Sequence, residues 1–190
     1  MTLDNQIILP ALRNMKDFEK LLDSPYEYIV LLDLHIGNLK NITTKAKQHK
    51  KKVLLHADLI HGLKADDYGI DYLCHQIQPE GIISTRANVI SKAKEKGLLA
   101  IQRLFLLDSS ALNKGCALIE KTKPDYIELL PGIIPEIIQE VHLKVKIPIF
   151  AGGFIRTTQD VESAISAGVK AVTTSNKELW EHYTPIHGLK

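Results

Sequence analysis

The feature that most constrains this chain is an eightfold alternation between short apolar runs and longer amphipathic segments. The apolar runs cover residues 7–10, 28–34, 53–57, 81–84, 98–106, 126–130, 149–151 and 171–173. They are continuous rather than alternating with polar residues, which is typical of parallel strands covered on both faces. Each repeat takes about 24 residues, enough for a strand, a helix and two tight loops. The pattern predicts an α/β fold, a (β/α)8 TIM-type barrel with short loops, rather than an open doubly wound sheet of five or six strands.

Several amphipathic segments carry signals for helix ends. Asn14 and Thr157 stand where N-caps are expected, and Ser109 or Ser110 is expected to cap the segment that follows the fifth apolar run. Gly97 is expected to end the helix before that run. We therefore expect a helix after each strand, with the last one short.

Length and composition indicate one domain. We expect a single barrel over residues 1–183 and a flexible tail over residues 184–190. No run of about 18 apolar residues predicts a membrane span, and the first residues lack the basic and apolar regions of a signal peptide. Cys74 and Cys116 lie beside apolar residues in helical patterns, which favours buried free thiols over a disulfide or a metal pair. A cytoplasmic protein is expected.

Polar residues and glycines follow the seventh and eighth predicted strands. Gly152 and Gly153 stop one strand, and Thr174, Ser175 and Asn176 stop the next. Two strands joined by one helix run parallel, so both stops lie at the same end of the sheet. Glycine lets a ligand approach the backbone, and the loops after the last two strands of such a barrel commonly bind phosphate. We predict a phosphate cup here; the alternative is a tight turn followed by a helix cap.

Charged residues are also expected at the carboxyl ends of other strands, where they would point into the barrel mouth. They are Asp33, His56, Asp58, Arg103 and Glu128. Asp33 shares parity with His35, and His56 with Asp58, so each pair is expected on one side of its strand. Arg103 and Glu128 lie on neighbouring strands and are expected to meet each other or a ligand, because a buried charge needs a partner. The alternative for each residue is a polar group whose hydrogen-bond partners lie within the protein and which binds no ligand.

The same residues leave the chemistry open. Aspartate, histidine and glutamate transfer protons, but they also bind the hydroxyl groups of a polyol. Asp33, Asp58 and Glu128 could hold a divalent ion, but no spaced ligand motif supports one, so we predict no metal and no cofactor. No lysine occupies a strand centre, as a Schiff-base aldolase would require.

Several motifs resemble one known family in the same order along the chain. They are residues 31–37 (LLDLHIG), 55–63 (LHADLIHGL), 81–86 (GIISTR), 102–109 (QRLFLLDS), 128–132 (ELLPG) and 151–155 (AGGFI). Together they are similar to the bacterial glycerol uptake operon antiterminator regulatory proteins, over about residues 7–180. The resemblance implies a non-enzymatic barrel that senses glycerol-3-phosphate. It also implies binding of leader mRNA from glycerol-metabolism operons, so that transcription passes a terminator. The competing hypothesis is a phosphosugar isomerase, aldolase or lyase that uses the same mouth.

The placement of lysines suggests where RNA would bind. The net charge of +2 argues neither for nor against nucleic acid. Lysines gather where helices end and strands begin, at Lys50, Lys51 and Lys52, Lys94 and Lys96, Lys121 and Lys123, Lys144 and Lys146, and Lys170, and the first five are the main candidates. These junctions lie opposite the predicted mouth, so they form a candidate RNA surface. The alternative is that lysine only complements the dipole at helix ends. If RNA binds this surface, a ligand in the mouth would have to act across the barrel or through an oligomer interface.

Overall fold

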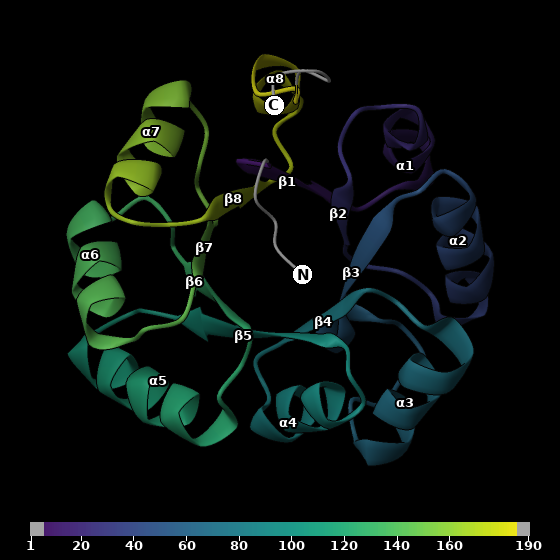
Figure 1. Ribbon diagram of the computed structural model, residues 1–190, viewed down its shortest axis with the longest axis horizontal. Coiled ribbons are helices and arrows are strands. Elements are labelled where there is room, and N and C mark those ends of the chain that lie inside the picture. The colour runs from purple at the N-terminus through teal and green to yellow at the C-terminus, as the bar shows by residue number, and fades with distance from the viewer. Residues whose placement is uncertain (1–5, 186–190) are drawn as a thin grey trace.

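The protein folds into a closed barrel of eight parallel strands, described for residues 6–185 by a computed structural model. Neighbouring strands follow chain order, and β8 pairs with β1 to close the ring (Figure 1). The strands are β1 (Ile8–Leu12), β2 (Tyr28–Leu31), β3 (Lys52–His56), β4 (Gly81–Ser84), β5 (Leu99–Phe105), β6 (Tyr126–Leu130), β7 (Ile149–Gly152) and β8 (Ala171–Thr174). The predicted TIM-barrel architecture is confirmed. Of the predicted tail, residues 186–190 lie outside the described range.

Helices surround the barrel as an outer ring (Figure 1). They are α1 (Met15–Leu22), α2 (Ile36–Gln48), α3 (Asp67–Tyr72), α4 (Ala87–Glu95), α5 (Ser109–Thr122), α6 (Pro135–Lys144), α7 (Thr158–Ser166) and α8 (Lys177–His182). A 3-10 turn, η1 (Ala57–Leu59), follows β3, and a π-helical turn, η2 (Leu73–Ile77), extends α3. No helix within residues 6–185 combines the length and apolar character needed to cross a membrane.

The helix caps agree with the sequence in all but one case. Asn14 caps α1 and Thr157 caps α7, as predicted. The predicted caps Ser109 and Ser110 are wrong, because the carboxylate of Asp108 accepts the N–H of Ala111 at 2.7 Å and caps α5. Both residue types cap helices well, so the sequence alone does not separate them.

Apolar side chains form two layers, one between the barrel and the helices and one inside the barrel. The inner layer includes Leu9, Leu54, Ile101, Tyr126 and Phe150. The rings of Tyr126 and Phe150, on β6 and β7, stack with their centroids 4.7 Å apart. Side chains two residues further along each strand also point inward, but nearer to the mouth. That next inward level is where the polar residues lie.

The structure also tests the predictions for the two cysteines and for the end of the second strand. Cys74 and Cys116 are free thiols, half-buried rather than fully buried. The second strand was expected to reach residue 34 but ends at Leu31, because Asp33 adopts a φ of 52°, which no strand tolerates.

Candidate functional site

Arg103 and Glu128 form a buried ion pair inside the barrel mouth. They are register partners on β5 and β6, and each lies two residues beyond an inward-facing apolar residue. Nε of Arg103 donates to Oε2 of Glu128 over 2.6 Å, and the two side chains are 12% and 1% exposed. The predicted contact between them is confirmed. Within residues 6–185, neither terminal nitrogen of this guanidinium has a hydrogen-bond partner.

Thr173 and Gly152 complete the environment of the Glu128 carboxylate. The hydroxyl of Thr173, on β8, donates to Oε1 of Glu128 over 2.6 Å. A Cβ on Gly152 would lie 2.4 Å from the Thr173 hydroxyl and 3.3 Å from Oε1 of Glu128. Real Cβ atoms do not approach that closely, so the glycine is needed for packing against this hydrogen bond. The sequence analysis missed Thr173, although its parity with the inward-facing Ala171 marks it.

His56, the last residue of β3, points inward at the same end of the barrel and is 3% exposed. Neither of its ring nitrogens has a hydrogen-bond partner among residues 6–185. Burial, aided by the nearby Arg103 guanidinium, lowers the pKa of His56 to about 4, against the opposing carboxylates of Glu128 and Asp58. The ring is therefore neutral near pH 7, with one donor and one acceptor nitrogen.

The loops after β7 and β8 lie side by side, as the sequence predicts. The amide of Asn176 donates to the carbonyl of Arg156 at 2.9 Å, and the hydroxyl of Thr174 donates to that of Ile155 at 3.4 Å. Gly153 and Phe154 adopt φ values of 78° and 61°. The side chains of Thr174 and Asn176 thus hold the two loops together, while Ser175 is exposed.

Asn176 also begins the last helix. Its side chain accepts the N–H of Glu178, and its own N–H donates to the hydroxyl of Thr174 at 3.1 Å. That N–H is already engaged, which removes it from the donors that the sequence offered to a phosphate. Gly153 and Ser175 remain predicted hydrogen-bond donors to the phosphate.

Asp33 was predicted to point into the barrel mouth, but it does not. It lies beyond the end of β2, and its carboxylate accepts from Arg13 at 2.5 Å, with side chains 32% and 64% exposed. His35 caps α2 by accepting the N–H of Gly37 at 3.1 Å. The predicted shared strand face of Asp33 and His35 is wrong, because the strand ends before both.

Asp58 also serves its own loop. It lies in the 3-10 turn after β3, so the predicted strand parity with His56 is wrong. Its carboxylate accepts from the hydroxyl of Ser84 at 2.7 Å and from the N–H and hydroxyl of Thr85 at 2.8 and 3.0 Å. These bonds fix the turn after β4. Within residues 6–185, no group of three His, Cys, Asp or Glu side chains is placed to hold a metal ion.

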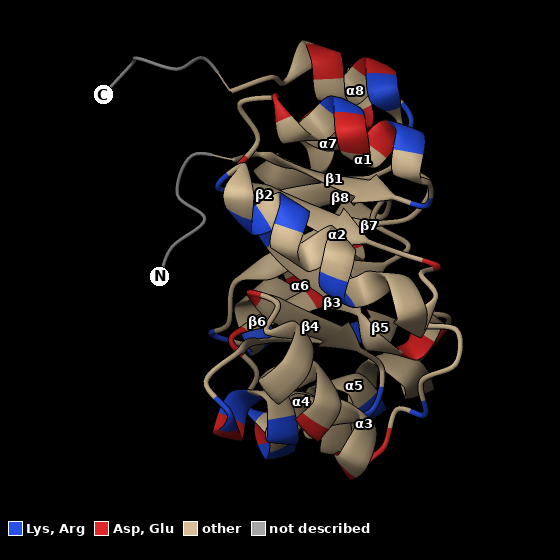
Figure 2. Cartoon of the chain, turned by 90° about the vertical axis from the view of Figure 1, so that its right-hand side faces the viewer, with Lys and Arg blue, Asp and Glu red and all other residues tan. Residues whose placement is uncertain are grey.

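The five lysines predicted as an RNA surface are mostly engaged elsewhere. Lys51 is 7% exposed and donates to the carbonyls of Ser24 and Tyr26, so it is a structural residue. Ion pairs hold Lys52 with Glu27, Lys94 with Asp125 and Lys96 with Asp71. Lys50 is exposed. Figure 2 shows blue and red residues interspersed over the helices on the side that faces the viewer.

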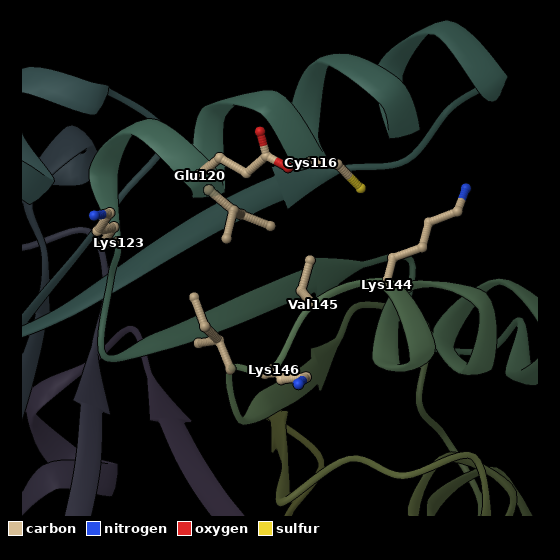
Figure 3. Close-up of a pocket in the computed structure, with 8 residues that line it drawn as sticks. Cys116, Glu120, Lys123, Lys144, Val145 and Lys146 are labelled. Atoms are coloured by element: carbon tan, nitrogen blue, oxygen red, sulfur yellow. The ribbon is translucent and has the colours of Figure 1, made fainter.

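A groove of about 590 Å3 lies at the end of the barrel opposite the mouth, between the last turns of α5 and α6. Ile119, Val145 and Ile147 contribute its apolar surface, and Lys123, Lys144 and Lys146 surround it (Figure 3). Lys123, Lys144 and Lys146 belong to the lysines that the sequence analysis places opposite the mouth, but none of the five main RNA candidates and none of the predicted effector-binding residues lines this groove.

The sequence between Ile8 and Trp180 matches the family model described as glycerol-3-phosphate responsive antiterminator. The chain belongs to this family. It is 56% identical to a glycerol uptake operon antiterminator regulatory protein of Listeria monocytogenes, whose crystal structure superposes with a TM-score of 0.93 over 95% of this chain and 98% of that one. An antiterminator-related protein of Thermotoga maritima is 27% identical, with a TM-score of 0.82 over 93% and 98% of the two chains.

This antiterminator family member is also similar to proteins with other names. An uncharacterized Escherichia coli protein, YgcP, is 32% identical over 91% of each chain. A deoxyribose phosphate aldolase of Aeropyrum pernix is 15% identical, with a TM-score of 0.68 over 90% of this chain and 86% of the other. At that identity the likeness to the aldolase shows the barrel fold alone.

Proposed function

We propose that this protein is a glycerol-3-phosphate-responsive antiterminator. In this proposal glycerol-3-phosphate is the effector, no cofactor is needed, and leader mRNA of glycerol-metabolism operons is the partner, so the protein acts in the cytoplasm. The observation that carries the proposal is the family match over residues 8–180, which includes every residue of the candidate site. The geometry of the mouth supports it with a place for each part of the effector.

The phosphate is assigned to the loops after β7 and β8, and the polyol to the ion pair beside them. Gly153 has a positive φ and no side chain to cover its backbone, and Ser175 supplies an exposed hydroxyl. Gly152 connects this loop to the Glu128 carboxylate, which suits hydroxyl groups. The unpaired terminal nitrogens of Arg103 suit phosphate oxygens.

His56 is the third recognition group of the proposed site. A buried imidazole with two unpartnered nitrogens is rare in folded proteins, because an unpaired buried polar group costs free energy. A hydroxyl of the effector, or a water between them, would give it a partner. Asp33 and Asp58 are assigned to the loops that frame the mouth rather than to direct contact with the effector.

The test measures glycerol-3-phosphate binding by calorimetry and retention of leader RNA on the immobilised protein with and without the effector. We expect binding of glycerol-3-phosphate but not of glycerol, and RNA retention that depends on the effector. Absence of RNA retention in both conditions would reject the regulatory function.

An enzyme acting on phosphosugars is the second candidate, favoured by the polar side chains of the mouth. Lys52 is the only lysine in any strand of residues 6–185, and it begins β3 at the end away from the mouth. That position argues against a Schiff-base aldolase. Turnover of glycerol-3-phosphate or of triose phosphates by the purified protein would favour this candidate.

A further inference from the structure

The groove between α5 and α6 joins lysines without an acidic partner in the described part of the chain to an apolar floor. Ile119 is 3% and Val145 8% exposed, and Ile147 packs beside them. Within residues 6–185, neither Lys123 nor Lys146 takes part in an ion pair. The charges that line the groove are three lysines and the single carboxylate of Glu120.

The third lysine, Lys144, is paired only at the surface. Its amino group lies 2.7 Å from Glu140 one turn earlier on α6, and both side chains are 46% exposed. Exposed pairs of this kind are weak and easily exchanged for another anion. Figure 3 shows the side chains of Lys123 and Lys144 toward opposite ends of the groove, with Lys146 beside its floor.

We propose that this groove binds leader mRNA, an inference that rests on the proposed antiterminator function. A single-stranded RNA presents flat apolar bases and one phosphate for each nucleotide. An apolar floor with lysines spaced around it matches that alternation, and the volume of about 590 Å3 lies within the range that holds a small ligand. Among the lysines at residues 50–52, Lys51 is buried and Lys52 is paired with Glu27, so neither offers this combination.

The groove also has a direct structural connection to the effector site. Lys123 lies five residues before Glu128 along the chain, and Ile147 lies five residues before Gly152. Strand β6 begins at Tyr126 and β7 at Ile149, just beyond these groove residues. Strands β6 and β7 therefore run from the floor of the groove to the ion pair and the glycine loop. A shift of either strand along its axis on effector binding would connect the mouth to the groove at the opposite end of the barrel.

The first test compares two triple substitutions of equal charge. One removes the groove lysines (Lys123→Gln, Lys144→Gln and Lys146→Gln), and the control removes three exposed lysines of α1 and α2 that pair with no acid within residues 6–185 (Lys16→Gln, Lys20→Gln and Lys40→Gln). Binding of a glycerol uptake operon leader transcript is measured with glycerol-3-phosphate at several salt concentrations. We expect about tenfold weaker binding for the groove variant. Its salt slope should fall by about 2, because each single-strand phosphate contact contributes about 0.7.

The second test leaves the groove lysines intact, so it does not depend on how well the triple variant folds. Cys116 lines the groove, whereas Cys74 lies in the π-helical turn after α3. In a Cys74→Ser protein, the rate of Cys116 alkylation is measured with effector alone and with effector plus the leader transcript. We expect the transcript to slow alkylation severalfold. An unchanged rate at saturating RNA would overturn the proposal.

The outcomes separate this inference from the function on which it rests. If the unaltered protein retains no leader transcript, the antiterminator function and the groove assignment fail together. If it binds RNA but the groove variant binds equally well, or the control variant loses as much affinity, only the groove assignment fails. Calorimetry without RNA should give both variants the glycerol-3-phosphate affinity of the unaltered protein.

Discussion

Two arginine–carboxylate pairs, one inside the barrel mouth and one on its rim, have opposite surroundings. Arg103 and Glu128 are 12% and 1% exposed, whereas Arg13 and Asp33 are 64% and 32% exposed. The contact distances are nearly the same, 2.6 and 2.5 Å. In the buried pair each charge depends on its partner, because neither is fully hydrated. The exposed pair competes with water and salt, so distance alone does not identify the pair that matters.

The largest effect is expected from Glu128→Gln. This substitution leaves the Arg103 charge buried without a carboxylate, which typically costs roughly 3–5 kcal/mol. Glycerol-3-phosphate binding should be lost as well. The free energy of unfolding is measured in urea by circular dichroism, and Arg103→Met added to Glu128→Gln should recover part of the loss. A cost below about 1 kcal/mol would place this pair in the same class as the exposed one.

The next effect is a pH dependence that arises from His56. The folded protein keeps this group neutral down to about pH 4, whereas the unfolded chain binds the proton below its ordinary value of 6.5. Stability therefore falls as the pH drops from 6.5 to 4, by up to about 3 kcal/mol, and this contribution is constant above and below that window. His56→Leu should show a flatter profile of unfolding free energy over the same range. Parallel profiles for the two proteins would mean that His56 is not held neutral.

A smaller effect is expected when alanine replaces either of two glycines that share the same backbone φ but lie in different parts of the barrel. Gly153 and Gly97 both have a φ of 78°, and a Cβ on either meets no atom closer than 3.4 Å. Each Gly→Ala substitution should therefore destabilise by about 1 kcal/mol through the backbone alone. Only Gly153→Ala should weaken glycerol-3-phosphate binding, which calorimetry can measure. Equal glycerol-3-phosphate affinities in the two variants would contradict the assignment of the phosphate to the loop after β7.

The smallest effect is expected at the exposed pair. Asp33→Asn should change stability by less than about 1 kcal/mol, because water replaces the lost partner of Arg13. Its glycerol-3-phosphate affinity should remain within about twofold of that of the unaltered protein, since we assign Asp33 to the rim. Thermal unfolding and calorimetry are sufficient to check both statements. A large loss of affinity would return Asp33 to the binding site.

The sequence predicts the features of the fold that depend on pattern. The apolar runs predict the barrel, and the positions of Arg103 and Glu128 on consecutive strands predict their contact. It does not predict features that depend on where the backbone turns. Asp33 leaves the sheet at a positive φ, and Asp58 enters a 3-10 turn, so counting strand parity misplaces both.

Burial is the second quantity that the sequence leaves open. Lys51 resembles its exposed neighbour Lys50 in the chain but is buried against two carbonyl groups. The unpartnered ring of His56 and the hydroxyl of Thr173 gain significance only when the packed barrel excludes water from them. Each of these environments is made by residues distant in the sequence, which local patterns do not report.

The proposed binding residues lie almost entirely in the second half of the barrel. Arg103, Glu128, Gly152, Gly153 and Thr173 all come from residues 99–176, as do the lysines of the groove. The half-barrel β5–β8 thus carries both proposed binding surfaces, apart from His56, and the half-barrel β1–β4 closes the ring around it. We therefore expect substitutions inside β5–β8 to change the selectivity for effector and RNA, and substitutions inside β1–β4, apart from His56, to change stability alone.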